Sequence, residues 1–211
     1  MPRIVTKKKI RRMKLYKLVF LSFLLLGISC KNDENKSKKK EPVAQAEAEP
    51  LPEMSVFQLP SSWTTQEREN IQLEELQGDV LVMVMIYTSC QAACPRLVAD
   101  MRNIQKNVSE EANGETKFVF VSIDPEVDTP ERLKAFAKEN QMDDDQWLFL
   151  RGDLEDTREF AAVLAVNYKR ISPMDFSHSN TISVFDKNGV LVHQKEGLGT
   201  NDSQTIEAIE R

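Results

Sequence analysis

The chain has 211 residues, of which 41% are hydrophobic, and its formal net charge is −5. Residues 1–29 carry eight basic and no acidic side chains, whereas residues 53–211 carry 15 basic and 28 acidic ones, a net charge of −13. Because affinity for phosphates depends on clustered Lys and Arg, a domain this acidic is not expected to bind nucleic acid. The composition also excludes a chain that is disordered throughout or that crosses a membrane many times.

Residues 1–29 are predicted to be an export signal. A basic stretch that ends at Lys17 is followed by an apolar run over residues 18–28, which is about half the length that a membrane-spanning helix needs. The small residues before Cys30 resemble a bacterial lipoprotein signal, in which Cys30 would be lipidated and would begin the mature chain. The alternative is an uncleaved signal anchor with an incidental cysteine. In either case we expect an exported domain in the cell envelope of a bacterium, held to the membrane and facing the periplasm or the exterior.

The segment between this signal and the acidic domain has little that could be buried. Residues 31–52 contain ten charged side chains and three prolines. We therefore expect residues 30–52, with the lipidated Cys30 at their start, to form a disordered stalk. The 159 residues that remain, 53–211, are enough for one well-buried core, so a single domain is predicted there.

A strand, a cysteine pair and a helix are predicted in succession after residue 80. Residues 80–87 are a continuous apolar run rich in β-branched side chains, which predicts a strand buried on both faces. Pro95 suits a helix start, and apolar residues then recur with helical spacing at Leu97, Met101, Ile104 and Val108. Cys90 and Cys94 thus lie between a strand and a helix N-terminus. Free N–H groups and the helix dipole there are expected to lower the pKa of a thiol.

Cys90 and Cys94 remain as an isolated pair if Cys30 is lipidated. In an exported protein, two cysteines most often form a disulfide. A bridge between these two would close a loop of only three residues, and such a small ring removes little chain entropy. The pair is therefore better explained as reactive or metal-binding than as structural.

The rest of the chain completes an α/β pattern. Strands are predicted over residues 117–123 and 147–150, and a hairpin over 181–185 and 190–193 with an Asn-Gly turn signal between its strands. Three helices are predicted in this part of the chain. The first starts at Thr129-Pro130, the second follows the capping residue Asp153 and ends near Val166, and the third starts near Ser203. This order fits a thioredoxin-like fold, with a central mixed sheet flanked by helices.

The chain has only two histidines. His178 lies in a polar stretch before the hairpin, whereas His193 is near the end of the second hairpin strand. In a thioredoxin-like layout, the loop before the hairpin packs beside the cysteine turn, so His178 is expected near Cys90 and Cys94, with His193 farther away. Two thiolates and one imidazole suit Cu(I), accept Cu(II) with a fourth ligand, and can also bind zinc. The ligand types alone leave the metal undecided.

Three motifs in order carry a family resemblance: Tyr-Thr-Ser-Cys-Gln-Ala-Ala-Cys-Pro at 87–95, Val-Ser-Ile-Asp-Pro-Glu-Val-Asp-Thr-Pro-Glu-Arg-Leu at 121–133, and His-Ser at 178–179. Together they resemble the Sco/SenC family of copper-handling proteins. The resemblance implies a thioredoxin-like fold and copper ligands at Cys90, Cys94 and His178. It also implies a metallochaperone that delivers copper to the binuclear copper centre of cytochrome c oxidase, or reduces the cysteines of that centre. We expect a monomer that binds a copper ion, Cu(I) or Cu(II), with the copper-accepting oxidase subunit as its partner.

One part of the motif departs from the family pattern. Gln91-Ala92-Ala93 stands where the family often has Pro-Asp or a similar polar pair. Because outer hydrogen bonds tune a metal site, redox properties are expected to differ here. The segment 124–130 is explained as an ordinary helix start, and Met83 and Met85 as core residues. Met174 is the one methionine to test as a soft axial ligand.

Two enzymatic alternatives stay open. A thiol–disulfide oxidoreductase of the cell envelope would use one thiolate of the Cys90/Cys94 pair to attack a partner disulfide and the other to resolve the mixed disulfide. The C-x-x-x-C spacing is one residue longer than in thioredoxins, and Asn180 occupies the position that resembles their cis-proline. A peroxiredoxin-like peroxidase is less consistent with the sequence, since the Pro and Thr usual before its reactive cysteine are missing.

Overall fold

The computed structural model describes residues 50–199 and 201–211, which belong to the compact unit Glu47–Arg211. The predicted signal peptide, Cys30 and nearly all of the predicted stalk lie outside the described residues, so these remain predictions from the sequence. None of the described helices is both long and apolar enough to cross a membrane.

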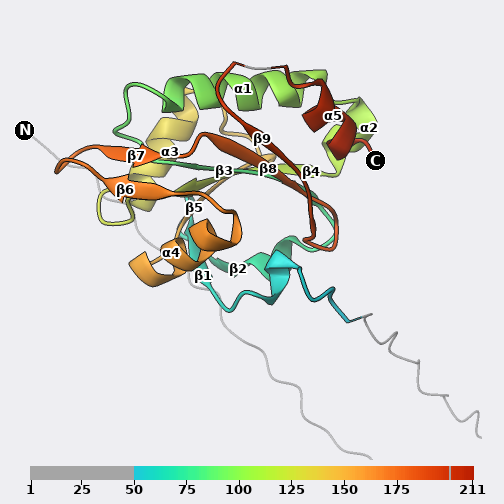
Figure 1. The fold of residues 1–211 in the computed structure, drawn as a ribbon, viewed down its shortest axis with the longest axis horizontal. Helices are drawn as coiled ribbons and strands as arrows, with labels where there is room; N and C mark the ends of the chain where they lie inside the picture. Colours follow the sequence, from blue (N-terminus) through green and yellow to red (C-terminus); the bar gives the residue numbers. More distant parts are fainter. Residues whose placement is uncertain (1–49, 200) are drawn as a thin grey trace, which may run out of the picture. The chain divides into compact units, whose positions relative to one another are not determined.

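A seven-stranded mixed sheet forms the centre of the domain, with the strand order β2-β1-β5-β4-β3-β8-β9 (Figure 1). Its strands are β1 (Ser62–Thr65), β2 (Asn70–Gln72), β3 (Val80–Ile86), β4 (Thr116–Ser122), β5 (Trp147–Arg151), β8 (Thr181–Phe185) and β9 (Leu191–Glu196). The central strand β3 pairs in parallel with β4 and antiparallel with β8. All its residues after Val80 are buried, which confirms the predicted strand buried on both faces.

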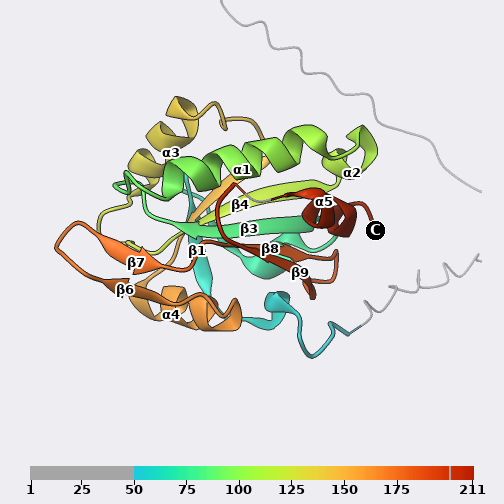
Figure 2. The ribbon, with the colours of Figure 1, turned by 45° about the horizontal axis from the view of Figure 1, so that its top comes forward.

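Helices cover both faces of this sheet. They are α1 (Cys94–Asn107), α2 (Glu110–Gly114), α3 (Pro130–Glu139), α4 (Leu154–Val163) and α5 (Ser203–Ile209), with two 3-10 turns, η1 (Val56–Gln58) and η2 (Leu73–Leu76). Figure 2 shows α1, α3 and α5 on one face and α4 on the other. This arrangement confirms the predicted single α/β domain with a central mixed sheet flanked by helices.

The helix starts follow local sequence signals. Thr129 caps α3 with its side-chain oxygen, which accepts the N–H of Arg132 at 3.4 Å, and Pro130 follows in the first turn. Asp153 caps α4 by accepting two backbone N–H groups at 2.8 Å. That helix ends at Val163, earlier than the predicted Val166, because Ala165 takes a left-handed conformation with a φ of 52°.

The core lies between the sheet and the helices. Side chains from α1 that were predicted on one face, Leu97, Met101 and Ile104, have no exposed surface. Met83 and Met85 are buried in β3, as expected for core residues. Phe120 of β4 stacks on Phe149 of β5 with ring centroids 4.9 Å apart. This core surrounds β3, whose carboxyl end leads into the cysteine turn.

A second, two-stranded sheet lies outside the seven-stranded one and was not predicted from the sequence. It pairs β6 (Tyr168–Arg170) with β7 (Phe176–His178), antiparallel. His178 therefore ends a strand instead of lying in a loop, which corrects the local structure predicted for it. Both strands have three residues and mostly polar side chains, so no apolar alternation marks them. Residues 168–178 are called the β6–β7 arm below.

Candidate metal-binding site

The two cysteines lie on the turn that leads from β3 into α1. Cys94 is the first residue of α1 and is fully buried, and Cys90 is 8% exposed. Both are free thiols. The backbone N–H of Cys94 donates to the Sγ of Cys90 at 3.4 Å, so the start of the helix points a hydrogen-bond donor at one sulfur. The sequence predicted this placement from the apolar run before the pair and Pro95 after it.

The two thiols differ in acidity. Burial acts to raise the pKa of the Cys90 thiol, but hydrogen bonds from the backbone of Cys94, the Cys94 thiol and the backbone of Ala92 together lower it below its ordinary value. Burial raises the pKa of Cys94, and the neighbouring Cys90 and Asp128 raise it further. The predicted lowering by the helix N-terminus is therefore right for Cys90 and wrong for Cys94, whose desolvation outweighs it.

His178 presents a free ring nitrogen to the inside of the domain. Its Nδ1 lies 3.0 Å from the carbonyl oxygen of Ser179, and because a carbonyl only accepts, Nδ1 carries the proton. Nε2 is buried and has no hydrogen-bond partner among the described residues. Burial lowers the pKa of the ring, against an opposing hydrogen bond to Ser179. A neutral imidazole whose Nδ1–H is fixed by a carbonyl is the usual metal-ligating form.

The ligand atoms of Cys90, Cys94 and His178 all lie within 4.8 Å of one another. The structure thus brings together the three residues that the sequence analysis selected. His193 is elsewhere, with its Nε2 3.1 Å from the hydroxyl oxygen of Thr205 in α5. Two sulfur donors and one unsatisfied imidazole nitrogen form a donor set that suits a soft metal ion, so the residues present fit copper.

The backbone of Met174 lies against the cysteine turn. Its carbonyl oxygen accepts a hydrogen bond from Ser89 Oγ at 3.5 Å, which places the tip of the β6–β7 arm against the cysteine turn. The side chain of Met174 is 69% exposed. Its neighbour Ile171 is exposed too, so the tip of the arm carries two apolar side chains in solvent.

Asp128 contributes to the site in a way that the sequence analysis missed. The α3 cap is Thr129, and the carboxylate of Asp128 instead turns inward, with no exposed surface. It accepts hydrogen bonds from the backbone N–H of Thr88 at 3.1 Å, from the Thr88 hydroxyl, and from Ser122 Oγ at 2.6 Å. Burial raises the pKa of Asp128, although these hydrogen bonds oppose the rise. Asp128 therefore holds the turn residue that comes two positions before Cys90.

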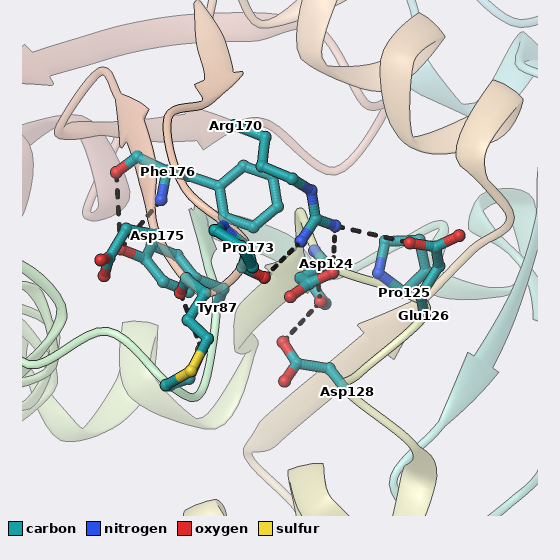
Figure 3. A network of polar contacts seen from close by, with 12 residues as sticks. Tyr87, Asp124, Pro125, Glu126, Asp128, Arg170, Pro173, Asp175 and Phe176 are labelled. Carbon is teal, nitrogen blue, oxygen red and sulfur yellow. Dashed lines mark hydrogen bonds and ion pairs between the residues drawn. The ribbon is translucent and has the colours of Figure 1, made fainter.

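Arg170 ties the β6–β7 arm to the loop after β4 (Figure 3). Its guanidinium lies 2.8 Å from Asp124 Oδ1 and 3.5 Å from Glu126 Oε2, and it donates to the Pro173 carbonyl at 3.1 Å. The guanidinium also lies over the Phe176 ring, 4.4 Å from its centroid. Asp124 is only 1% exposed, so this ion pair is half-buried. No local pattern marks Arg170, which is one of several charged residues in a polar stretch.

Comparison with known proteins identifies the family. A sequence profile described as SCO1/SenC matches residues 49–211, well over half of the chain. The chain belongs to the SCO1/SenC family. A SCO1 protein homologue of Bacillus subtilis is 36% identical over 103 residues, which cover 48% of this chain and 53% of that protein. The chain thus spans about half the length of this curated relative.

Solved structures of family members share the fold. The crystal structure of a SCO1/SenC family lipoprotein from Bacillus anthracis is 28% identical, covers 74% of this chain and 94% of that one, and superposes with a TM-score of 0.66. ScoI of Arabidopsis thaliana, solved with copper bound, is 21% identical, covers 73% of this chain and 98% of that one, and has a TM-score of 0.61. These likenesses confirm the thioredoxin-like fold that the sequence predicted.

Proposed function

We propose that this protein is a metallochaperone that binds copper through Cys90, Cys94 and His178 and passes it to an acceptor. The observation that carries the proposal is the grouping of two sulfurs and one imidazole nitrogen within 4.8 Å, with Nε2 of His178 buried and unpartnered among the described residues. An unpaired buried polar atom is costly unless a ligand satisfies it. Thiolates and imidazole are the ligands that copper prefers.

The geometry also suits transfer of the ion to another protein. Cys90 retains some exposed surface and His178 is half-buried, whereas Cys94 is enclosed. An acceptor thiolate or imidazole can approach from the side of Cys90 and His178, while Cys94 keeps hold of the ion until the exchange is complete. Copper is the cargo in this scheme. From the family resemblance, the proposed acceptor is the binuclear copper centre of cytochrome c oxidase.

We propose that the domain is tethered to the membrane through Cys30. The sequence signal at residues 1–30 supports the anchor, and the similar Bacillus anthracis protein is described as a lipoprotein. Residues 31–52 would then space the site from the lipid surface. Thioether-linked lipid on Cys30, detected by mass spectrometry of protein from its own membrane, is the expected result. A chain that keeps residues 1–29 would contradict it.

Thiol–disulfide exchange is the second candidate, and the difference between the two thiols favours it. Cys90, with its lowered pKa, is the better nucleophile, and Cys94 is the buried resolving thiol. The Cys90 thiolate would attack a partner disulfide and release one partner thiolate. Cys94, losing its proton, would then displace the second partner sulfur, so that the partner is reduced and a Cys90–Cys94 disulfide remains.

An anaerobic copper titration of the reduced chain tests the first proposal. We expect one Cu(I) per chain in competition with a Cu(I) chelator. His178→Ala removes a ligand, so its loss of affinity should exceed the roughly 10- to 100-fold that follows from losing an outer hydrogen-bond partner of a ligand. The matched control is His193→Ala, which removes the other histidine and should leave the affinity unchanged. Equal affinities of the wild type and His178→Ala would show that the three-ligand site is wrong.

A disulfide-reduction assay on the metal-free protein separates the two candidates. Turnover of insulin or a scrambled disulfide at a rate comparable to thioredoxin, unaltered in His178→Ala, would favour the oxidoreductase. Slow or absent turnover together with tight copper binding would favour the metallochaperone.

A further inference from the structure

The hydroxyl of Tyr87 lies between the two parts of the chain that supply the candidate ligands. Tyr87 follows β3 directly and comes three residues before Cys90. Its hydroxyl donates to the carbonyl oxygen of Phe176 at 3.4 Å and accepts the backbone N–H of the same residue at 3.3 Å. Phe176 begins β7, the strand that ends at His178. One phenol group therefore bonds both polar backbone groups of Phe176, the first residue of the strand that carries the histidine (Figure 3).

The ring of Tyr87 contacts the same strand. It packs against Phe176 with ring centroids 5.1 Å apart, and against His178 in an edge-on geometry at 5.8 Å. Tyr87 is 4% exposed, so water competes little for its hydrogen bonds. Edge-on aromatic contacts fix the orientation of a ring as well as its position. Tyr87 thus touches the histidine through its ring and the backbone of the same strand through its hydroxyl.

The β6–β7 arm has few other attachments close to His178. It forms a sheet separate from the seven-stranded one, so no ladder of backbone hydrogen bonds joins it to β3. The Arg170–Asp124 ion pair and the Ser89–Met174 hydrogen bond hold residues nearer the tip of the arm. The contacts of Tyr87 with Phe176 and His178 tie the histidine strand to the residue that follows β3.

We propose that Tyr87 is a positioning residue of this site, whose hydroxyl sets the distance between the His178 imidazole and the two sulfurs. The proposal rests on the function proposed above and deepens it. A phenylalanine at this position would keep the ring contacts but could neither donate to the carbonyl nor accept the N–H of Phe176. The arm would then remain folded against the domain, with His178 held less tightly near Cys90.

Tyr87→Phe and Tyr168→Phe form a matched pair of variants. Tyr168 packs against the same Phe176 ring, with centroids 6.3 Å apart, but its hydroxyl faces Arg158 and forms no hydrogen bond with the strand of His178. Each variant removes one phenol oxygen from a ring that contacts Phe176. Only Tyr87→Phe removes hydrogen bonds to the strand of His178, so a general effect of losing a hydroxyl would appear in both variants.

The first measurement uses the metal-free full chain. Hydrogen exchange of the Phe176 amide, followed by NMR, is expected to be about three- to tenfold faster in Tyr87→Phe, as for one lost hydrogen bond, and unchanged in Tyr168→Phe. The His178 ring signals should shift in Tyr87→Phe alone. Exchange and ring signals identical in the two variants would overturn the proposal.

The second measurement uses copper. The Cu(I) affinity of Tyr87→Phe is expected to fall about tenfold, and the absorption bands of the Cu(II) form to change, while Tyr168→Phe matches the wild type. A Cu(I) affinity of Tyr87→Phe within twofold of Tyr168→Phe would overturn the proposal even with faster exchange, because the site would then not depend on the contact. If the wild-type chain binds no copper, the proposed function fails, and the metal-free measurement still decides whether Tyr87 holds His178.

Discussion

The seven-stranded sheet and the β6–β7 arm each supply part of the candidate site, and they are held in place differently. The sheet positions Cys90 and Cys94 through β3, whose residues after Val80 are buried between helices on both faces. The arm positions His178 through a few polar and aromatic contacts, among them Tyr87–Phe176 and Arg170–Asp124. The cysteines are therefore fixed by folding itself, whereas the histidine depends on contacts that can change without unfolding the domain.

The largest expected effect is on the sheet. Phe120 is fully buried in β4 and stacks on Phe149. Phe120→Ala should lower the free energy of unfolding by about 3–5 kcal/mol, the usual result of removing a buried aromatic ring, as measured by urea denaturation. Met174→Ala on the exposed tip of the arm is the control and should stay within about 0.5 kcal/mol of the wild type. If Phe120→Ala and Met174→Ala lower the free energy of unfolding by comparable amounts, the sheet and the arm are not held differently.

A smaller effect is expected where the arm joins the sheet. Arg170→Met would leave the buried Asp124 carboxylate without its ion-pair partner, at a cost of about 1–2 kcal/mol. The exposed pair of Lys134 and Glu67, 2.5 Å apart, provides the control, since Lys134→Met should cost less than about 0.5 kcal/mol. Copper affinity should fall in Arg170→Met only. If Arg170→Met is as stable as Lys134→Met and binds copper as tightly, the β6–β7 arm does not need this ion pair.

The pH dependence of stability should reveal the burial of His178. Burial lowers the pKa of His178 in the folded chain below the value of 6.5 for an exposed ring. The unfolded chain therefore takes up a proton first as the pH falls, so stability that is present above pH 6.5 is lost as the pH drops toward the folded pKa. The metal-free wild type should lose more stability between pH 7.5 and 5.5 than His178→Gln does. If the stability of the wild type and of His178→Gln changes with pH in the same way, the His178 ring is exposed.

The smallest effect is expected at Met174. Its side chain is exposed, and the three donors from Cys90, Cys94 and His178 form a set without it. Met174→Leu keeps the apolar surface and removes the thioether. The Cu(I) affinity should change less than about twofold, whereas removal of His178 should cost more than about 100-fold, since even outer partners of a ligand contribute roughly 10- to 100-fold. A larger loss would add Met174 to the ligand set as the axial ligand considered from the sequence.

Short-range patterns made most of the fold predictable. The buried strand β3, the start of α1 at the cysteine pair and the β8–β9 hairpin each follow from residues within one local segment. The strands β6 and β7 were missed because three-residue polar strands have no periodic signal. The burial of Asp128 was missed because Thr129 next to it already explained a helix start, although its carboxylate contacts Thr88, 40 residues earlier.

The sequence by itself determined the residue types of the site, the turn that carries both thiols and the family to which the motifs are similar. Only the tertiary structure decided which cysteine is the more acidic, because a helix N-terminus and burial act in opposite directions and their balance depends on packing. It also decided how His178 is held. Tyr87 and Phe176 are 89 residues apart in the chain, and Asp124 and Arg170 are 46 apart. Contacts over such separations form only when strands and loops pack together, and no local pattern encodes them.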